Sequence, residues 1–383
     1  MKEKIRNSNF ELMRIVSMLF IVIYHVRMHS GFSNRATGTV GMLLDFITII
    51  MVVHVNSFVL VSGYYQSKSN MKLSKVISLN NAVWFYKVLF LIIAIILTKY
   101  FSVSITNNIE PLEKIKTLLP FDYGIYWYID CYLVLYLISP ILNKLINTLS
   151  KKNYQRVIAV LFILLSIIPT ITIDEVIYTR AGHSVASFIF LYLLGAYLRI
   201  YPIKENYYFK RLTDTGRKTL FFILIILSAI AVLFCQIVSK ELIGYGTATS
   251  YLGRILEMIY LNYGSPLIII ESVAYFLFFE TLNIKSKIIN TIAKYTFGVY
   301  LIHENIYVRD NIYRWLGYVN INNITIKTIA IMFITGIALF IISIIIEFFR
   351  QLVFKFIYNR KISSKFRKWY RGYFERLGFS INW

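Results

Sequence analysis

The segment FELMRIVSMLFIVIYHVRMH, from Phe10 to His29, decides the fold class. Its length is that of one transmembrane helix, about 20 mostly apolar residues. It nevertheless contains Glu11, Arg14 and His25, and an ionisable group at bilayer depth costs a few kcal/mol on insertion scales. The segment therefore predicts a membrane helix whose polar side chains face a protein interior or a wet cavity.

The rest of the chain supports an all-α, polytopic membrane protein. Of its 383 residues, 57% are hydrophobic and only 16% are charged. The runs LFLIIAIIL (89–97) and IALFIISIIIEFF (337–349) are apolar on every side, without the alternation of a β-barrel strand. We predict about ten transmembrane helices, at approximately 10–28, 40–62, 79–98, 123–143, 157–173, 184–200, 219–238, 264–281, 292–308 and 326–349.

The distribution of Lys and Arg predicts the orientation. Dense basic stretches fall in alternate connections, which the positive-inside rule assigns to the cytoplasm together with both termini. These connections are the N-terminus, 63–78, 144–156, 201–218, 282–291 and the C-terminal tail. The net charge of +22 is thus explained by cytoplasmic loops, and we expect no nucleic-acid partner.

Two regions are expected: a transmembrane domain, 1–349, and a basic and aromatic cytoplasmic tail, 350–383. The tail, RKISSKFRKWYRGYFERLGFSINW in its last part, suits an interfacial amphipathic helix on anionic lipid.

Arg14 and His25 lie eleven residues apart in the first predicted helix. At 1.5 Å and 100° per residue this is about 16 Å and three turns, so the two side chains share one face. Glu11, three residues before Arg14, can pair with it. The structural alternatives are that Arg14 only snorkels at the interface and that His25 is a buried structural histidine.

Other polar groups in predicted helices are weaker candidates. Asn56 and Ser62 belong to HVNSFVLVSGYY, whose first residue, His54, we interpret as structural. Trp127 lies where an aromatic belt is expected, and Asp130 inside the fourth helix needs a partner.

The ninth predicted helix brings His303, Glu304 and Arg309 near the outer face, and Glu271 is a further acid inside the eighth. Metal-binding signatures such as H-E-x-x-H or a Cys/His quartet do not occur, so we expect no metal.

Four ordered blocks resemble the membrane-bound acyltransferase 3 family. They are FELMR with Arg14-x10-His25, VNSFVLVSGYY, WYIDCYLVLYLISPILNKL and TFGVYLIHEN, which together span residues 10 to about 310. Members are bacterial enzymes that modify surface polysaccharides and other extracytoplasmic acceptors. A basic cluster often follows the S-G-[YF] motif in the family, and here it consists of lysines, Lys68, Lys72 and Lys75.

The resemblance implies transfer of an acyl group, usually acetyl from acetyl-CoA, to a sugar hydroxyl. It implies that Arg14, Lys72 and Lys75 hold the CoA phosphates and that His25 is the general base or a transient acyl carrier. The supporting or acceptor-side residues would be Glu11, Asn56, Ser62, Trp127, Asp130, His303 and Glu304.

The expected partners are acyl-CoA, a glycan or lipid-linked saccharide acceptor, and the lipid bilayer of the bacterial cytoplasmic membrane. Succinyl remains an alternative to acetyl. A glycan or lipid-linked sugar transporter is the alternative function, although we find no internal repeat and no pair of broken helices, which transporters often have. A sensor or structural protein with a degenerate site is the third reading.

Overall fold

A computed structural model describes residues 7–102, 105, 126–173, 179–243, 247–260 and 262–358. All regular secondary structure in these ranges is helical, which confirms the all-α fold class. The predicted tail from residue 359 and the start of the fourth predicted span, 123–125, lie outside the described residues.

Seven helical segments are long and apolar enough to cross a membrane, and each coincides with a predicted span. They are α1 (Ser8–His29), the pair α3 (Gly38–Met51) and α4 (His54–Gln66), α5 (Leu73–Phe101), α7 (Trp127–Thr148), the series α8 (Lys151–Phe162), η1 (Ile163–Ile167) and α9 (Ile168–Thr172), α12 (Asp214–Ile243), and α18 (Ile326–Tyr358).

The remaining three predicted spans fall on shorter helices, so the count of ten stays a prediction. They correspond to α10 (Val185–Ile200), α14 (Pro266–Glu280) and α16 (Thr296–His303). The connecting helices are α2 (Phe32–Arg35), η2 (Arg180–Gly182), η3 (Ile203–Glu205), α11 (Tyr207–Lys210), α13 (Thr247–Glu257), α15 (Lys287–Ile292), α17 (Ile306–Trp315) and η4 (Tyr318–Asn320).

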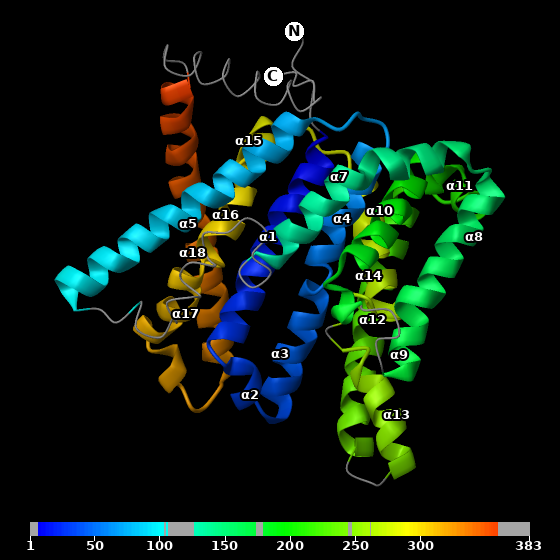
Figure 1. Cartoon of the computed structure of the whole chain (residues 1–383). Coiled ribbons are helices and arrows are strands. Elements are labelled where there is room, and N and C mark those ends of the chain that lie inside the picture. Colours follow the sequence, from blue (N-terminus) through cyan, green and yellow to red (C-terminus); the bar gives the residue numbers. More distant parts are fainter. Residues whose placement is uncertain are drawn as a thin grey trace.

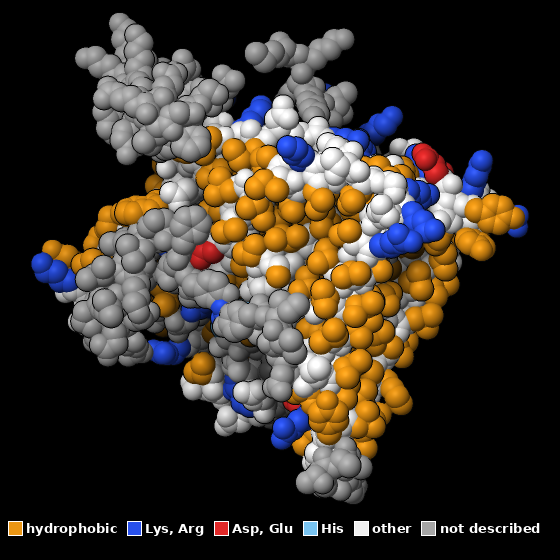
Figure 2. All heavy atoms as spheres, turned by 45° about the vertical axis from the view of Figure 1, so that its right-hand side comes forward, with side chains coloured by type: hydrophobic (Ala, Val, Ile, Leu, Met, Phe, Trp, Pro, Cys, Tyr) orange, Lys and Arg blue, Asp and Glu red, His pale blue; other side chains and the backbone are white. Residues whose placement is uncertain are grey.

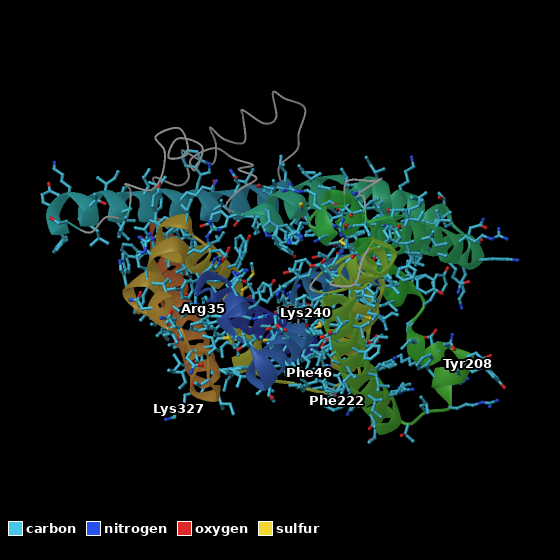
Figure 3. The ribbon with its side chains drawn as sticks, turned by 90° about the horizontal axis from the view of Figure 1, so that it is seen from below. Arg35, Phe46, Tyr208, Phe222, Lys240 and Lys327 are labelled. Atoms are coloured by element: carbon cyan, nitrogen blue, oxygen red, sulfur yellow. The ribbon has the colours of Figure 1, made fainter. Side chains whose placement is uncertain are left out.

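Helix α1 is the centre of the bundle. It packs against α4, α14, α16 and α18, and it begins at the end of the bundle where α18 finishes (Figure 1). In the view from the opposite end, Phe46 of α3 lies near the middle, with Lys327 of α18 to one side and Tyr208 of α11 far to the other (Figure 3). On the polar face of α1, the side chains of Arg14 and His25 are accordingly only partly exposed, 30% and 17%.

The outer helices present their apolar side chains outwards. Phe234 of α12 is 65% exposed and Ile334 of α18 is 66% exposed, as expected for side chains that meet lipid. Figure 2 shows hydrophobic side chains over a broad flank of the molecule, with Lys and Arg concentrated towards its edges. This surface is that of a multi-pass membrane protein.

Helices α4 and α10 cross at two glycines. A Cβ on Gly63 would overlap the carbonyl oxygen of Tyr192, and a Cβ on Gly195 would overlap that of Leu60. Small residues at such crossings let the two backbones approach closely. The crossing holds α4, which forms one wall of the site described below, at a fixed depth.

Two predicted spans are interrupted, so the expectation of unbroken helices was wrong. A turn at Val52 and Val53 separates α3 from α4, and α16 ends at His303 before α17 begins at Ile306. Neither break contains Gly or Pro, the residues that usually reveal one in a sequence. In the second break Asn305 caps α17 by accepting a hydrogen bond from the Tyr307 backbone N–H (3.1 Å).

The helix crossing predicts that even a small side chain at position 195 destabilises the fold. Gly195→Ala forces α4 and α10 apart and should lower the free energy of unfolding by about 1–3 kcal/mol, the range for an overpacked interior. Thermal unfolding in nanodiscs measures the loss. The matched control is Gly216→Ala on α12, whose Cβ would approach only side-chain atoms of Thr213 and Leu212, the nearest at 3.3 Å. Equal melting temperatures for Gly195→Ala and the wild-type protein would contradict the crossing.

Candidate functional site

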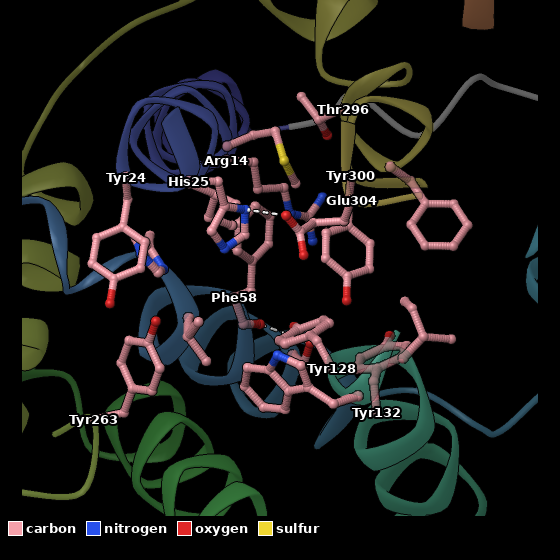
Figure 4. Close-up of a pocket in the computed structure, with 18 of the residues that line it drawn as sticks. Arg14, Tyr24, His25, Phe58, Tyr128, Tyr132, Tyr263, Thr296, Tyr300 and Glu304 are labelled. Atoms are coloured by element: carbon pink, nitrogen blue, oxygen red, sulfur yellow. Dashed lines mark hydrogen bonds and ion pairs between the residues drawn. The ribbon is translucent and has the colours of Figure 1, made fainter. Parts of the chain in front are cut away.

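A cavity of about 480 Å³ lies against α1 (Figure 4). Its walls come from α1, α4, α5, α7, α16 and α17 and from the loops before α10, α14 and α16. Arg14 and His25 both line it, as their shared helix face predicted. Of the predicted site residues, those that line the cavity are Arg14, His25, Ser62, Lys75, Trp127 and Glu304.

One end of the cavity, which we call the cationic end, carries Arg14, Lys75 and Lys294. The Arg14 guanidinium donates a hydrogen bond to Glu11 (3.1 Å), which leaves further donors on its fork. The Lys75 ammonium donates to the Tyr132 hydroxyl (3.1 Å) and lies 4.6 Å from the centre of the Tyr136 ring. Three cations with donors to spare can bind an anion of several charges.

At the other end, His25 is held by two partners. Its Nδ1 lies 3.0 Å from Nε2 of His303 and 2.9 Å from Oε1 of Glu304. The tautomers follow from the next contact, because Nδ1 of His303 lies 2.6 Å from the carbonyl oxygen of Val299 and must donate to it. Nε2 of neutral His303 is then an acceptor, so His25 donates from Nδ1.

It follows that Nε2 of a neutral His25 carries no proton. Figure 4 shows this second ring nitrogen turned away from Glu304 and towards the open part of the cavity. An imidazole nitrogen with a free lone pair can accept a proton or attack a carbonyl carbon. His25 is thus poised for either role.

Glu304 organises this end of the cavity. Only 7% of the residue is exposed, and its carboxylate also meets Nε2 of His29 (3.1 Å) and the Arg309 guanidinium (3.6 Å). Its position follows from the break between α16 and α17, since Glu304 is the first residue after α16 ends. The Tyr126 hydroxyl accepts a hydrogen bond from the Asn305 amide (3.0 Å), which fixes the break against α7.

The same atoms form the one candidate metal cluster within the described residues. Ligand atoms of His25, His303 and Glu304 lie within 4.8 Å of one another, and two imidazoles with a carboxylate are a donor set that suits zinc. Two features weigh against a cation. The Arg309 guanidinium lies 3.6 Å from Glu304 and would repel it, and the shared Nδ1 proton already accounts for the close approach of the three groups.

Several predicted site residues lie outside the cavity lining. Asn56 is buried and donates to the Tyr263 carbonyl (2.9 Å) and the Ser272 hydroxyl (3.1 Å), which makes it a link between α4 and α14. Glu11 accepts a hydrogen bond from Arg14, and His303 contacts Nδ1 of His25. Lys72 lies directly before α5, and its backbone N–H donates to the Tyr136 hydroxyl. Asp130 is half-buried on α7.

Other lining residues were not predicted for the site. His29 could have been found, because it lies four residues after His25 on the same helix face. His54, interpreted as structural, also lines the cavity, as do Tyr24, His183 and Tyr263. Lys294, His183 and Tyr263 come from separate loops, and a single sequence does not show that these loops meet.

Three rings of the lining pack together: that of Trp127, at the start of α7, and those of His183 and Tyr263, on two loops. The ring centres of Trp127 and His183 are 4.3 Å apart, and those of His183 and Tyr263 are 4.8 Å apart. Burial raises the pKa of the Tyr263 hydroxyl well above its ordinary value, so the group remains a hydrogen-bond donor near neutral pH. This side of the cavity is aromatic and uncharged.

Comparison with known families gives one result. A model of the acyltransferase 3 family, described as an acyltransferase domain, matches residues 7–348. No curated protein and no solved structure matches the chain.

Proposed function

The chain belongs to the acyltransferase 3 family, and we propose that it transfers an acyl group, acetyl in the first place, from acyl-CoA to a hydroxyl of a cell-surface or lipid-linked saccharide. The observation that carries the proposal is that Arg14 and His25 line a single cavity, with His25 oriented by Glu304. A transporter would not need a histidine whose free ring nitrogen faces the cavity and whose other nitrogen is held by a carboxylate. The family model is also that of an acyltransferase domain.

The cationic end of the cavity suits the donor. The phosphates of CoA are anionic, and Arg14, Lys75 and Lys294 line this end together. From Arg14 to His25 the rise along α1 is about 16 Å, a stretch over which the narrow pantetheine arm would extend. Lys72, also expected to bind the donor, would act from outside the lining, three residues before Lys75.

The other end suits the reaction. Nε2 of His25 takes the proton of the acceptor hydroxyl as its oxygen attacks the thioester carbonyl, so that a C–O bond forms. The C–S bond then breaks, and the proton passes from His25 to the departing thiolate. Glu304 accepts the Nδ1 hydrogen bond of His25 and stabilises the positive ring that forms between these steps.

A transient acyl-histidine is the second form of the same chemistry. In it, Nε2 of His25 attacks the thioester carbon first, the C–S bond breaks and CoA leaves as the thiolate. The acceptor hydroxyl then attacks the acyl carbon, the C–N bond to the ring breaks, and the hydroxyl proton passes through Nε2 of His25 to the CoA thiolate. Both forms use the same lone pair and the same hydrogen bond to Glu304.

The orientation follows from the charge distribution. The positive-inside rule favours a cytoplasmic location for both termini and for the cationic end, where acyl-CoA is available. His25, three turns further along α1, would then meet an acceptor from the outer side. In a bacterium this membrane is the cytoplasmic membrane.

His25→Ala should lower acetyl transfer by about 10²–10⁴-fold, the usual contribution of a general acid–base group. The assay follows label from radioactive acetyl-CoA into glycan, using protein in nanodiscs and saccharide from the cell of origin. Leu19→Ala, on the same helix but outside the cavity lining, is the control for disturbance of α1. Wild-type rates of transfer by a folded His25→Ala protein would rule out the role of His25.

Arg14→Gln should raise the KM for acetyl-CoA about tenfold, because it removes charged hydrogen bonds worth roughly 1.5 kcal/mol or more. The KM for acetyl-pantetheine, which has no nucleotide phosphates, should change little. Arg156→Gln on the exposed part of α8 is the matched control. An equal rise for both donors would show that Arg14 does not recognise the phosphates.

A further inference from the structure

One part of the cavity wall, made of aromatic and histidine rings, takes no part in the donor path proposed above. We call it the aromatic arm, and it consists of Tyr24, His54, Trp127, His183 and Tyr263. The rings follow one another from His25. The ring centres of His25 and Tyr24 are 5.7 Å apart, those of Tyr24 and His54 are 5.4 Å apart, and those of His54 and Tyr263 are 5.6 Å apart. The arm therefore starts beside His25.

His54 is the most informative residue of the arm. It is 1% exposed, and neither of its ring nitrogens has a hydrogen-bond partner among the described residues. Leaving a buried polar group unpaired costs about 1–3 kcal/mol, so native structures seldom do it without a reason. Because His54 lines the cavity, a ligand with hydroxyl groups would give it the partners that the protein does not.

The position of His54 depends on the break between α3 and α4. It is the first residue of α4, directly after the turn at Val52 and Val53. If α3 and α4 formed one continuous helix, there would be no turn at this point of the cavity wall. The break thus gives the imidazole its place near the middle of the span, beside Tyr24 of α1 and opposite the loop that carries Tyr263.

The other groups of the arm fit a sugar ring. Figure 4 shows the hydroxyls of Tyr24 and Tyr263 directed towards each other across the cavity. Trp127 and Tyr263 both line the cavity, with their rings 25° from parallel and 6.4 Å between centres. A pyranose has C–H groups on its faces, which pack on aromatic rings, and hydroxyls around its edge, which bond to imidazole and phenol groups.

The lack of acidic and basic side chains in the arm favours a neutral ligand. None of its five residues is an acid, lysine or arginine, whereas the cationic end gathers three cations. An anionic acceptor would be bound more favourably by guanidinium or ammonium groups. We propose that the aromatic arm binds one neutral pyranose ring of the acceptor and that His54 bonds to its hydroxyls, placing a neighbouring hydroxyl at His25.

This inference rests on the proposed function, because only an acyltransferase would use the bound sugar as an acceptor. Its test measures sugar binding and does not require turnover. Saturation-transfer NMR on protein in nanodiscs measures binding of methyl pyranosides of glucose, galactose, mannose and N-acetylglucosamine, with sorbitol as the acyclic polyol. At least one pyranoside should bind the wild-type protein, and sorbitol should not. Failure of the whole panel to bind would overturn the proposal.

Three variants locate the binding. His54→Phe keeps an aromatic ring but loses both nitrogens, and it should weaken the bound pyranoside about tenfold, the value of one good hydrogen bond. His54→Gln, which keeps a donor and an acceptor, should weaken it less. Tyr275→Phe is the control, because the Tyr275 hydroxyl bonds to Ser17 (3.2 Å) and lies outside the cavity lining.

The outcomes separate the two proposals. Unchanged pyranoside binding in His54→Phe overturns the role of the arm, even if acetyl transfer to glycan is normal. A raised KM for acetyl-CoA in His54→Phe, with pyranoside binding intact, assigns the arm to the pantetheine chain and also overturns it. Pyranoside binding that depends on His54, in a protein that transfers no acetyl group, supports the arm and contradicts the proposed function.

Discussion

The hydrogen bond between Nδ1 of His25 and the Glu304 carboxylate, 2.9 Å long, is the interaction on which the site depends. It joins the central helix α1 to the break between α16 and α17, and it sets which His25 nitrogen faces the cavity. Glu304 is buried, so its charge needs partners, and His25, His29 and Arg309 provide them. The position of Glu304 at the break brings its carboxylate to His25, while His303, the last residue of α16, supplies the second contact.

The membrane explains why these contacts gather in one place. Ionisable groups on α1 are disfavoured in hydrocarbon, and they become tolerable only where other polar groups surround them. The bundle meets this condition by placing α1 at its centre and by enclosing a cavity along one of its faces. The breaks in the two interrupted spans both lie next to residues that line this cavity, His54 and Glu304. There, protein and cavity can satisfy backbone groups that lipid would leave unpaired.

The sequence predicted the parts of the site that lie on one helix. Helical spacing was enough to place Arg14 and His25 on a shared face, and it would also have revealed His29. Contacts between helices were not predictable in this way: Asn56 proved to link α4 and α14, while His54 proved to line the cavity. The two helix breaks were not predicted because they contain neither Gly nor Pro. Since the breaks determine where His54 and Glu304 lie, the positions of these two residues were not predicted either.

The central claim is that one cavity connects a donor bound at Arg14 to His25. A cryo-EM structure in nanodiscs, with an acetyl-CoA analogue whose sulfur is replaced by a methylene group, tests it most directly. We expect phosphates beside Arg14 and Lys75 and the acetyl carbonyl within reach of Nε2 of His25. An analogue bound outside the cavity, or with its acetyl group at the cationic end, would show that the cavity does not carry the donor to His25.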